Sequence, residues 1–191
     1  MPERSPMLIL ASNSPRRREL LLSLGIPFAV EAADIEEIEL LDDPREVPLR
    51  NAERKAAAVA ARHPHDPVLG ADTVIVFRDA VIGKPRDEAD ALRILLSLAG
   101  KTHEVVTGLA LLRGADGFRR IWRETTRVTF KPFGRETAER YLSLVSVLDK
   151  AGAYAIQESG EFLVESVDGS IENVIGLPLE RLQEELMRLN D

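Results

Sequence analysis

Residues 7–22 read MLILASNSPRRRELLL and join an apolar run to a helix signal. The run at residues 7–11 predicts a short strand. Ser14 is a residue type that caps helix N-termini, and Pro15 suits the first helical position. The N–H groups of a first helical turn have no partner within the helix, so they point outward with the positive end of the helix dipole behind them. We therefore expect a strand, a tight turn and a helix whose start binds an anion.

Three arginines, Arg16, Arg17 and Arg18, occupy this predicted first turn. Carboxylates are the charges normally favoured at a helix start, so three cations there oppose the helix dipole unless a multiply charged anion fills the site. We interpret the turn as a binding site for a polyphosphate. The alternative is a basic helix start that only water surrounds.

The rest of the chain mixes helix and strand patterns, and the turn GADG at residues 114–117 joins two of the strands into a long hairpin. Because the amino-terminal part alternates strand with helix, we expect an α/β fold: a mixed, twisted sheet with flanking helices, in a single domain over residues 1–191. Apolar residues at helical spacing predict further helices at residues 45–62, 87–99, 134–146 and 179–189. Strand-forming runs lie at residues 26–31, 67–77, 80–83, 103–112, 117–130, 153–157, 161–166 and 171–175.

The composition excludes several classes of site. The 191 residues include no cysteine and only three histidines, so disulfides and thiolate metal sites are excluded and any metal is expected on carboxylates. The net charge of −7 argues against binding nucleic acid through a broad basic surface. The apolar runs are far shorter than a membrane span, and no signal-peptide core is recognisable. We expect no membrane partner and a cytoplasmic location.

Asp72 interrupts an apolar strand, VLGADTVIVF at residues 68–77. A buried carboxylate is costly unless a metal ion, a lysine or several hydrogen-bond donors compensate its charge. These conditions also prepare a general base or a metal ligand, so Asp72 is our candidate for either role. The alternative is an aspartate that caps a turn at the end of a strand, which Gly70 would support.

Two further side chains are expected near the ends of predicted strands. Lys84 follows the run at residues 80–83, where α/β proteins place ligand contacts, and a lysine there is a compact point charge for phosphate. Gln157 ends the run at residues 153–157, and its amide carries the donor and the acceptor needed to read a nucleobase edge. The alternatives are a solvated turn lysine and an ordinary glutamine at a strand end.

Five blocks, in order, resemble the Maf family of nucleoside triphosphate pyrophosphatases, and the resemblance runs from about residue 7 to residue 185. The blocks are ASNSPRR (11–17), GADT (70–73), GKP (83–85), DKAGAYAIQ (149–157) and GLPL (176–179). The resemblance implies a mixed α/β fold with two lobes around a central cleft, commonly in a homodimer. It also implies divalent-metal-dependent hydrolysis of a nucleoside triphosphate to the monophosphate and pyrophosphate. The family is associated with removal of non-canonical nucleotides and with septum formation.

The resemblance also implies roles for individual residues. Ser12, Arg16 and Arg17 match the phosphate-binding turn, and Asp72 matches the proton acceptor. The alternative for Glu37 and Lys55, from their sequence pattern alone, is that both are ordinary charged residues on a solvent-exposed surface. The remaining matches are Lys55, Lys84 and Glu37 as charged site residues, and Thr73 and Gln157 as base-selecting residues. We expect Arg16, Arg17, Lys55 and Lys84 to hold the triphosphate.

We expect Asp72, with Glu37 nearby, to hold Mg²⁺ or Mn²⁺ through oxygen ligands. The blocks GADT and DKAGAY are similar to the branch of the family that hydrolyses dTTP and UTP. Two positions depart from the family pattern: Ala155 stands where glycine is frequent, and Glu172 lies in a loop that is often neutral or basic.

Two other functions remain open at this point. One is a purine-directed pyrophosphatase acting on inosine or xanthosine triphosphate or on 7-methyl-GTP. The other is a nucleotide-binding regulator of cell division without turnover. A buried acid favours an enzyme, because a sensor gains affinity from cations and has little use for a buried carboxylate.

Overall fold

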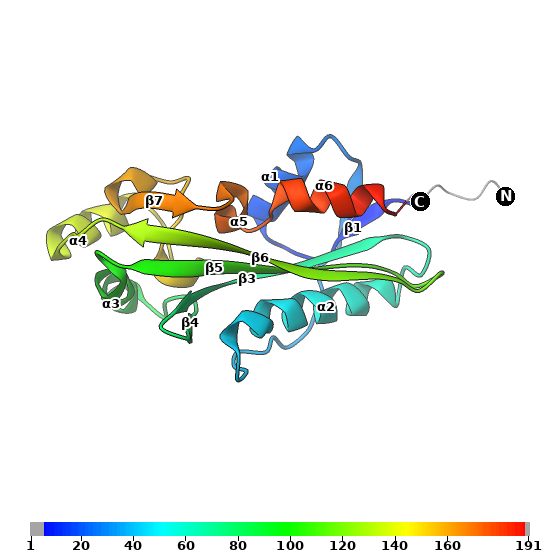
Figure 1. The fold of residues 1–191 in the computed structure, drawn as a ribbon, viewed down its shortest axis with the longest axis horizontal. Coiled ribbons are helices and arrows are strands. Elements are labelled where there is room, and N and C mark those ends of the chain that lie inside the picture. The colour runs from blue at the N-terminus through cyan, green and yellow to red at the C-terminus, as the bar shows by residue number, and fades with distance from the viewer. Residues whose placement is uncertain (1–5, 190–191) are drawn as a thin grey trace.

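The computed structural model describes residues 6–189 of the chain, with helices and strands mixed along it (Figure 1). The strands are β1 (Leu8–Leu10), β2 (Phe28–Val30), β3 (Val68–Phe77), β4 (Ala80–Ile82), β5 (Thr102–Arg113), β6 (Phe118–Phe130) and β7 (Val164–Asp168). The α-helices are α1 (Pro15–Ser23), α2 (Val47–Ala60), α3 (Glu88–Leu98), α4 (Arg135–Leu144), α5 (Ile171–Ile175) and α6 (Leu179–Met187). Short 3₁₀ helices are η1 (Pro44–Glu46), η2 (Ala151–Ala153) and η3 (Gly160–Phe162).

The seven strands within residues 6–189 form one mixed sheet, which confirms the predicted fold class. Its order is β2-β1-β3-β5-β6-β7, and β4 pairs with the end of β3. β1 pairs in parallel with β2 and β3, and the other neighbours are antiparallel. The long hairpin of β5 and β6 runs along the whole molecule, as the GADG turn predicted (Figure 1).

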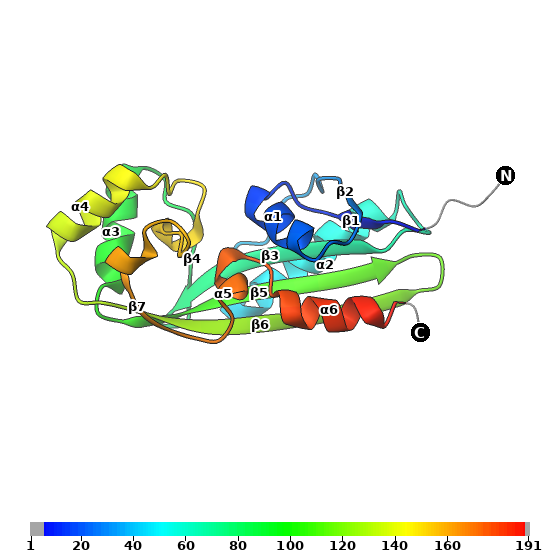
Figure 2. The ribbon, with the colours of Figure 1, turned by 90° about the horizontal axis from the view of Figure 1, so that it is seen from above.

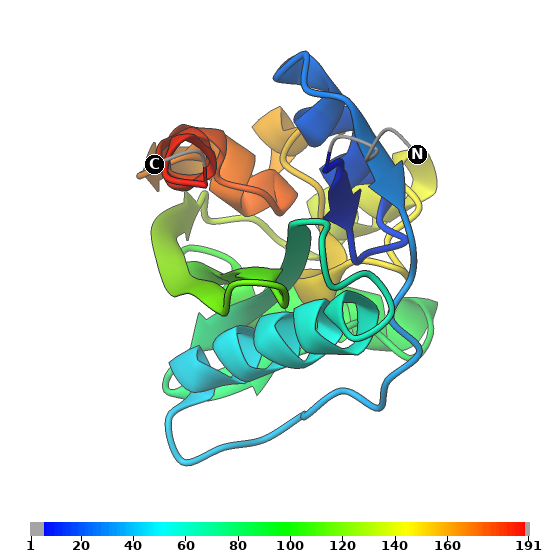
Figure 3. The same cartoon turned by 90° about the vertical axis from the view of Figure 1, so that its right-hand side faces the viewer.

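Helices cover both faces of the sheet in the lobe that contains β1 and β2. α2 lies on one face, and α1 and α6 lie on the other (Figures 1 and 3). Alternation along β3 separates the two packing layers, since Val68 packs with α2 while Leu69 and Ala71 pack with the α1 and α6 side. The strand side chains thus alternate between two apolar cores.

The second lobe is built by α3 and α4 at the far end of the hairpin (Figure 2). Phe130 and Tyr141 are fully buried in its core, which also takes in Ile75 at the end of β3. Within residues 6–189, no helix is long and apolar enough to cross a membrane.

The sheet has a gap beside the middle of β3. β1 pairs with β3 only at residues 68–69, and β4 pairs with β3 only at residues 75–77. Among the described residues, no strand pairs with residues 70–74 on that side, although β5 pairs with them on the other. Asp72 and Thr73 therefore lie on an open strand edge.

Three predicted strands are wrong in place or in kind. Residues 153–157 are not a strand, because Gly152 and Ala153 adopt positive φ values of 72° and 59° that break an extended backbone. Residues 171–175 form helix α5, which Ser170 caps through the Asn173 N–H. The strand predicted at residues 161–166 is β7 at Val164–Asp168, preceded by η3.

Candidate active site

One cavity of about 1020 Å³ opens at the gap in the sheet, between the two lobes. It is lined by the turn after β1, the connection after β2, one face of α2, the middle of β3, the loop after β4 and the segment that contains η2. All nine residues predicted for the site line this cavity: Ser12, Arg16, Arg17, Glu37, Lys55, Asp72, Thr73, Lys84 and Gln157.

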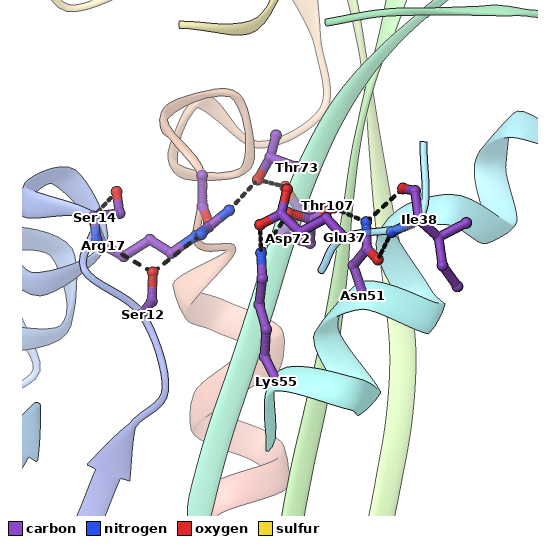
Figure 4. A network of polar contacts seen from close by, with 11 residues as sticks. Ser12, Ser14, Arg17, Glu37, Ile38, Asn51, Lys55, Asp72, Thr73 and Thr107 are labelled. Carbon is purple, nitrogen blue, oxygen red and sulfur yellow. Dashed lines mark hydrogen bonds and ion pairs between the residues drawn. The ribbon is translucent and has the colours of Figure 1, made fainter. Parts of the chain in front are cut away.

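At the floor of the cavity, Lys55 lies between two carboxylates (Figure 4). Its Nζ is 2.8 Å from Asp72 Oδ1 and 2.6 Å from Glu37 Oε1. The side chains of Lys55 and Asp72 are each only 11% exposed, whereas Glu37 is half exposed and faces the opening. Because the lysine compensates the buried aspartate, the carboxylate remains tolerable inside the apolar strand.

Helix α2 lies close enough to the sheet for its polar side chains to reach Asp72, because two strand positions that face the helix are glycines. A Cβ on Gly70 would lie 2.1 Å from the Ala52 carbonyl oxygen, and a Cβ on Gly108 would lie 2.3 Å from the Pro48 carbonyl carbon. The two glycines therefore permit a close approach of helix to sheet. Asn51 and Lys55 lie one turn apart on this close face, so both reach the aspartate.

Arg17 is held by acceptors of the protein itself. Its Nε donates to the Gly176 carbonyl at 3.0 Å, its Nη1 to Ser12 Oγ at 3.2 Å and its Nη2 to Thr73 Oγ1 at 3.0 Å (Figure 4). Burial lowers the pKa of Arg17, and the charges of Asp72 and Glu37 act in the opposite direction. Ser14 caps α1 by accepting from the Arg17 N–H, as predicted.

Arg16 reaches across the cavity to the second lobe. Its Nη1 lies 2.9 Å from Asp149 Oδ2, in an ion pair whose two side chains are 27% and 59% exposed. Asp149 also pairs with Lys150. Burial alone would raise the pKa of Asp149, but hydrogen bonds from Lys150 and Arg16 outweigh it and lower the pKa below its usual value.

The electrostatics of the cavity favour ionised carboxylates. Partial burial would raise the pKa of Glu37, but the hydrogen bond and charge of Lys55 outweigh it, with smaller contributions from Lys84 and Arg17, so the net pKa is lowered. Ionised oxygens beside several cations suit a ligand that carries both phosphate and metal charges.

The donor set fits a divalent cation that shares its coordination with a substrate. No group of three or more metal-ligating His, Cys, Asp or Glu side chains occurs in the described part of the chain. Mg²⁺, however, is commonly bound by one or two carboxylates together with substrate phosphates and water. Glu37 and Asp72 line the same cavity, and Lys55 bonds only one oxygen of each. The remaining lone-pair sites of the two carboxylates would be the ligands of such a cation.

Residues 7–189 match the family described as Maf-like protein. The chain belongs to the Maf family. A protein from Akkermansia muciniphila named dTTP/UTP pyrophosphatase is 46% identical over 91% of this chain and 92% of its own length. One of the same name from Bacillus cereus is 40% identical over 98% of this chain and 92% of its own. The solved Ham1 protein of Staphylococcus aureus shares the fold, with a TM-score of 0.54 at 15% identity over 97% of this chain and all of that one.

In this Maf-family chain, the remaining predicted residues lie in the second lobe. Lys84 is exposed in the loop after β4, and Gln157 is exposed in a turn rather than at the end of a strand. Ala155 is buried, and its backbone N–H donates to the Tyr141 hydroxyl at 2.9 Å. Ala155, which stands where the family pattern often has glycine, is therefore at a position whose backbone is held by a buried tyrosine.

Sequence reasoning missed Asn51 and the cross-cleft role of Asp149. Asn51 had a detectable signal, because it falls on the same helix face as the buried residues Ala52, Lys55 and Ala56. A polar residue on an apolar face needs a partner. The pairing of Asp149 with Arg16 had no such signal, since the two residues are 133 positions apart.

Proposed function

We propose that the protein hydrolyses nucleoside triphosphates to the nucleoside monophosphate and pyrophosphate, with dTTP and UTP as preferred substrates. The names of relatives that are 40–46% identical over nine-tenths or more of the chain support the activity and the pyrimidine preference. The observation that carries the assignment is the single cavity that joins Asp72 to cations from both lobes. Hydrolysis of a triphosphate requires both the acid and the cations, because the water must be positioned by a base and the charge of the leaving group must be neutralised.

In the proposed reaction, a water oxygen bonds to the α-phosphorus while the bond from that phosphorus to the bridging oxygen breaks and pyrophosphate leaves. Asp72 accepts the proton of the water. A carboxylate offers about four lone-pair sites, and Lys55 and Asn51 each donate one hydrogen bond to it. Arg16 and Lys84 neutralise charge on the phosphates. Arg17 acts mainly by fixing Ser12 and Thr73, since its guanidinium is already bonded to both.

Mg²⁺ or Mn²⁺ is the proposed cofactor, held by Asp72 and Glu37. A divalent cation there would supply positive charge next to the scissile bond. Thr73 and Gln157 are proposed to select the base. We further propose that the chain is a single domain, that it acts in the cytoplasm as a homodimer, and that its substrates include modified pyrimidine nucleotides whose removal keeps them out of nucleic acid.

The test is an assay that separates nucleoside monophosphate from pyrophosphate by chromatography, with Mg²⁺ or Mn²⁺ and a panel of triphosphates. The panel is dTTP, UTP, CTP, inosine triphosphate, xanthosine triphosphate and 7-methyl-GTP. We expect dTTP and UTP to be consumed fastest. Fastest turnover of a purine nucleotide would contradict the pyrimidine preference, and no pyrophosphate from any nucleotide would leave only a binding role.

Asp72→Asn separates catalysis from binding in the same assay. The amide keeps the shape of the side chain but is a poor proton acceptor, so we expect kcat to fall by about 100-fold or more. Nucleotide affinity, measured by calorimetry, should change little because Arg16 and Lys84 remain. Turnover within a few-fold of the unaltered protein would remove Asp72 from the proposed role.

A further inference from the structure

Asn51 is a buried amide whose hydrogen-bonding groups are all directed at the chain itself. It lies on α2 and is 2% exposed. Its Oδ1 accepts from the Ile38 N–H at 2.8 Å, and its Nδ2 donates to the Ile38 carbonyl at 2.9 Å and to Asp72 Oδ2 at 3.1 Å (Figure 4). Both N–H donors and the acceptor oxygen are therefore used.

Asn51 and Lys55 together define the orientation of the Asp72 carboxylate. Lys55 binds one oxygen and Asn51 binds the other. The terminal torsion of an aspartate is broad and has weak intrinsic preferences. A single donor would leave the carboxylate free to turn about its Cβ–Cγ bond, whereas donors on both oxygens fix its plane.

The same amide also places the segment that carries Glu37. Residues 31–41 contain neither helix nor strand, so local backbone bonding does not fix their path. Ile38 directly follows Glu37, and its N–H and carbonyl are both bound by Asn51. One side chain of α2 thus holds the Glu37 segment and Asp72 at the same time.

We propose that Asn51 is a positioning residue that sets Glu37 and Asp72 in one arrangement, so that the two proposed metal ligands face the same part of the cavity and Asp72 is aligned to accept the proton of the water. The proposal rests on the proposed function, in which these two carboxylates serve hydrolysis. Asn51 acts through them and not on the substrate, because its amide is committed to Ile38 and Asp72.

Asn51→Leu tests the proposal by removing all three hydrogen bonds with a side chain of similar size. We expect kcat for dTTP to fall at least 10-fold while KM stays within about 3-fold, since the phosphate-binding Arg16 and Lys84 are untouched. Amide hydrogen exchange at Ile38 and its neighbours should become faster. This second readout needs no turnover, so it remains informative if dTTP is not a substrate.

Asn51→Asp separates the two contacts. It keeps an acceptor for the Ile38 N–H but places a carboxylate against Asp72 in place of a donor. We expect kcat to fall at least 10-fold while exchange at Ile38 stays closer to that of the unaltered protein. If Asn51→Leu does not fold, Asn51→Asp decides the proposal by its kcat.

Asp90→Asn is the matched control for loss of stability. Asp90 is a buried polar residue on α3, it accepts from the Arg86 N–H, and it does not line the cavity. This variant should melt at a lower temperature with unchanged kcat. Values of kcat for Asn51→Leu within about 2-fold of the unaltered protein, unchanged Ile38 exchange, or an equal loss of kcat in Asp90→Asn would each overturn the proposal. Absence of pyrophosphate release by the unaltered protein would instead refute the proposed function.

Discussion

His103 on β5 is a buried imidazole close to the candidate site. It is 2% exposed, and its Nε2 lies 2.9 Å from the hydroxyl of Tyr154, which lines the cavity. Phe130 meets its ring edge-on at 4.9 Å between centroids. Burial lowers the pKa of His103 to about 4, because removing the imidazole from water disfavours its charged form. The ring is therefore neutral at physiological pH.

This depressed pKa predicts a loss of stability on the acidic side. Above pH 6.5 the imidazole is neutral in both the folded and the unfolded chain and contributes nothing. As pH falls below 6.5, the unfolded chain binds the proton first, so the free energy of unfolding decreases until the folded-state pKa is reached. At pH 5 the loss is about 2 kcal/mol. Urea unfolding of the unaltered protein and of His103→Gln at pH 7.5 and pH 5 measures it, and the variant should lack this part of the loss. Equal pH dependence in both proteins would contradict the burial argument.

At the residue scale, the sequence was informative where chemistry and pattern conflicted. Asp72 in an apolar strand and arginines at a helix start both required a compensating partner. Lys55 and Asn51 are partners of Asp72, and Asp149 is a partner of Arg16. Arg18 is exposed and does not line the cavity, so the polyphosphate site predicted from three arginines stays a prediction that rests on Arg16 and Arg17. Asn51 and Asp149 depend on which elements meet in space. Their partners, Ile38 and Arg16, could not be inferred from pattern alone.

At the scale of elements, the contact between α2 and the sheet determines the floor of the cavity. The contact is close because Gly70 and Gly108 present no side chain to the helix backbone. Since Asn51 and Lys55 both reach Asp72 from this helix, a small outward shift of α2 would lengthen two hydrogen bonds at once.

Gly108→Ala tests this contact. The added Cβ would lie 2.3–2.4 Å from backbone atoms of Pro48 and Leu49, so the helix must move. We expect the free energy of unfolding to fall by roughly 1–3 kcal/mol. We also expect kcat/KM for dTTP to fall by more than the decrease in the folded fraction of the protein explains. Gly134→Ala is the control, because nothing lies within 4 Å of its added Cβ. Unaltered activity and stability in Gly108→Ala would contradict the close-packing argument.

The elements that sequence reasoning misjudged share one physical cause. Short apolar runs fit a strand and a helix equally well. In IENVI, residues 171–175, the apolar positions 171, 174 and 175 also match one helix face, and Ser170 supplies the cap. The run at residues 153–157 is apolar up to Gln157, as in a buried strand, but the positive φ values at Gly152 and Ala153 interrupt an extended backbone.

At the scale of the whole molecule, the two lobes share their longest strands. β5 and β6 pair along twelve positions and pass through both lobes, so neither lobe can lose its sheet without the other (Figure 2). We expect one cooperative thermal transition by calorimetry, with equal calorimetric and van't Hoff enthalpies. Saturating dTTP with metal should move the whole transition upward. Two separated transitions would contradict the proposed single domain.

More of the overall architecture than of the site geometry could be predicted from the sequence. The hairpin, the long helices and the mixed sheet follow from periodicity and turn residues. The distances across the cavity do not, because its walls come from segments as far apart as residues 16 and 149. Only the order of the five blocks pointed to their convergence.

The open edge of β3 at residues 70–74 also bears on aggregation. An unpaired strand edge is a template on which a foreign polypeptide can add itself. Residues 72–74 of this edge line the cavity between the two lobes, and the Arg16–Asp149 ion pair bridges the lobes. A compact nucleotide can enter this space far more easily than an extended peptide can. The architecture that exposes backbone to a small molecule thereby protects the same backbone from amyloid-like pairing.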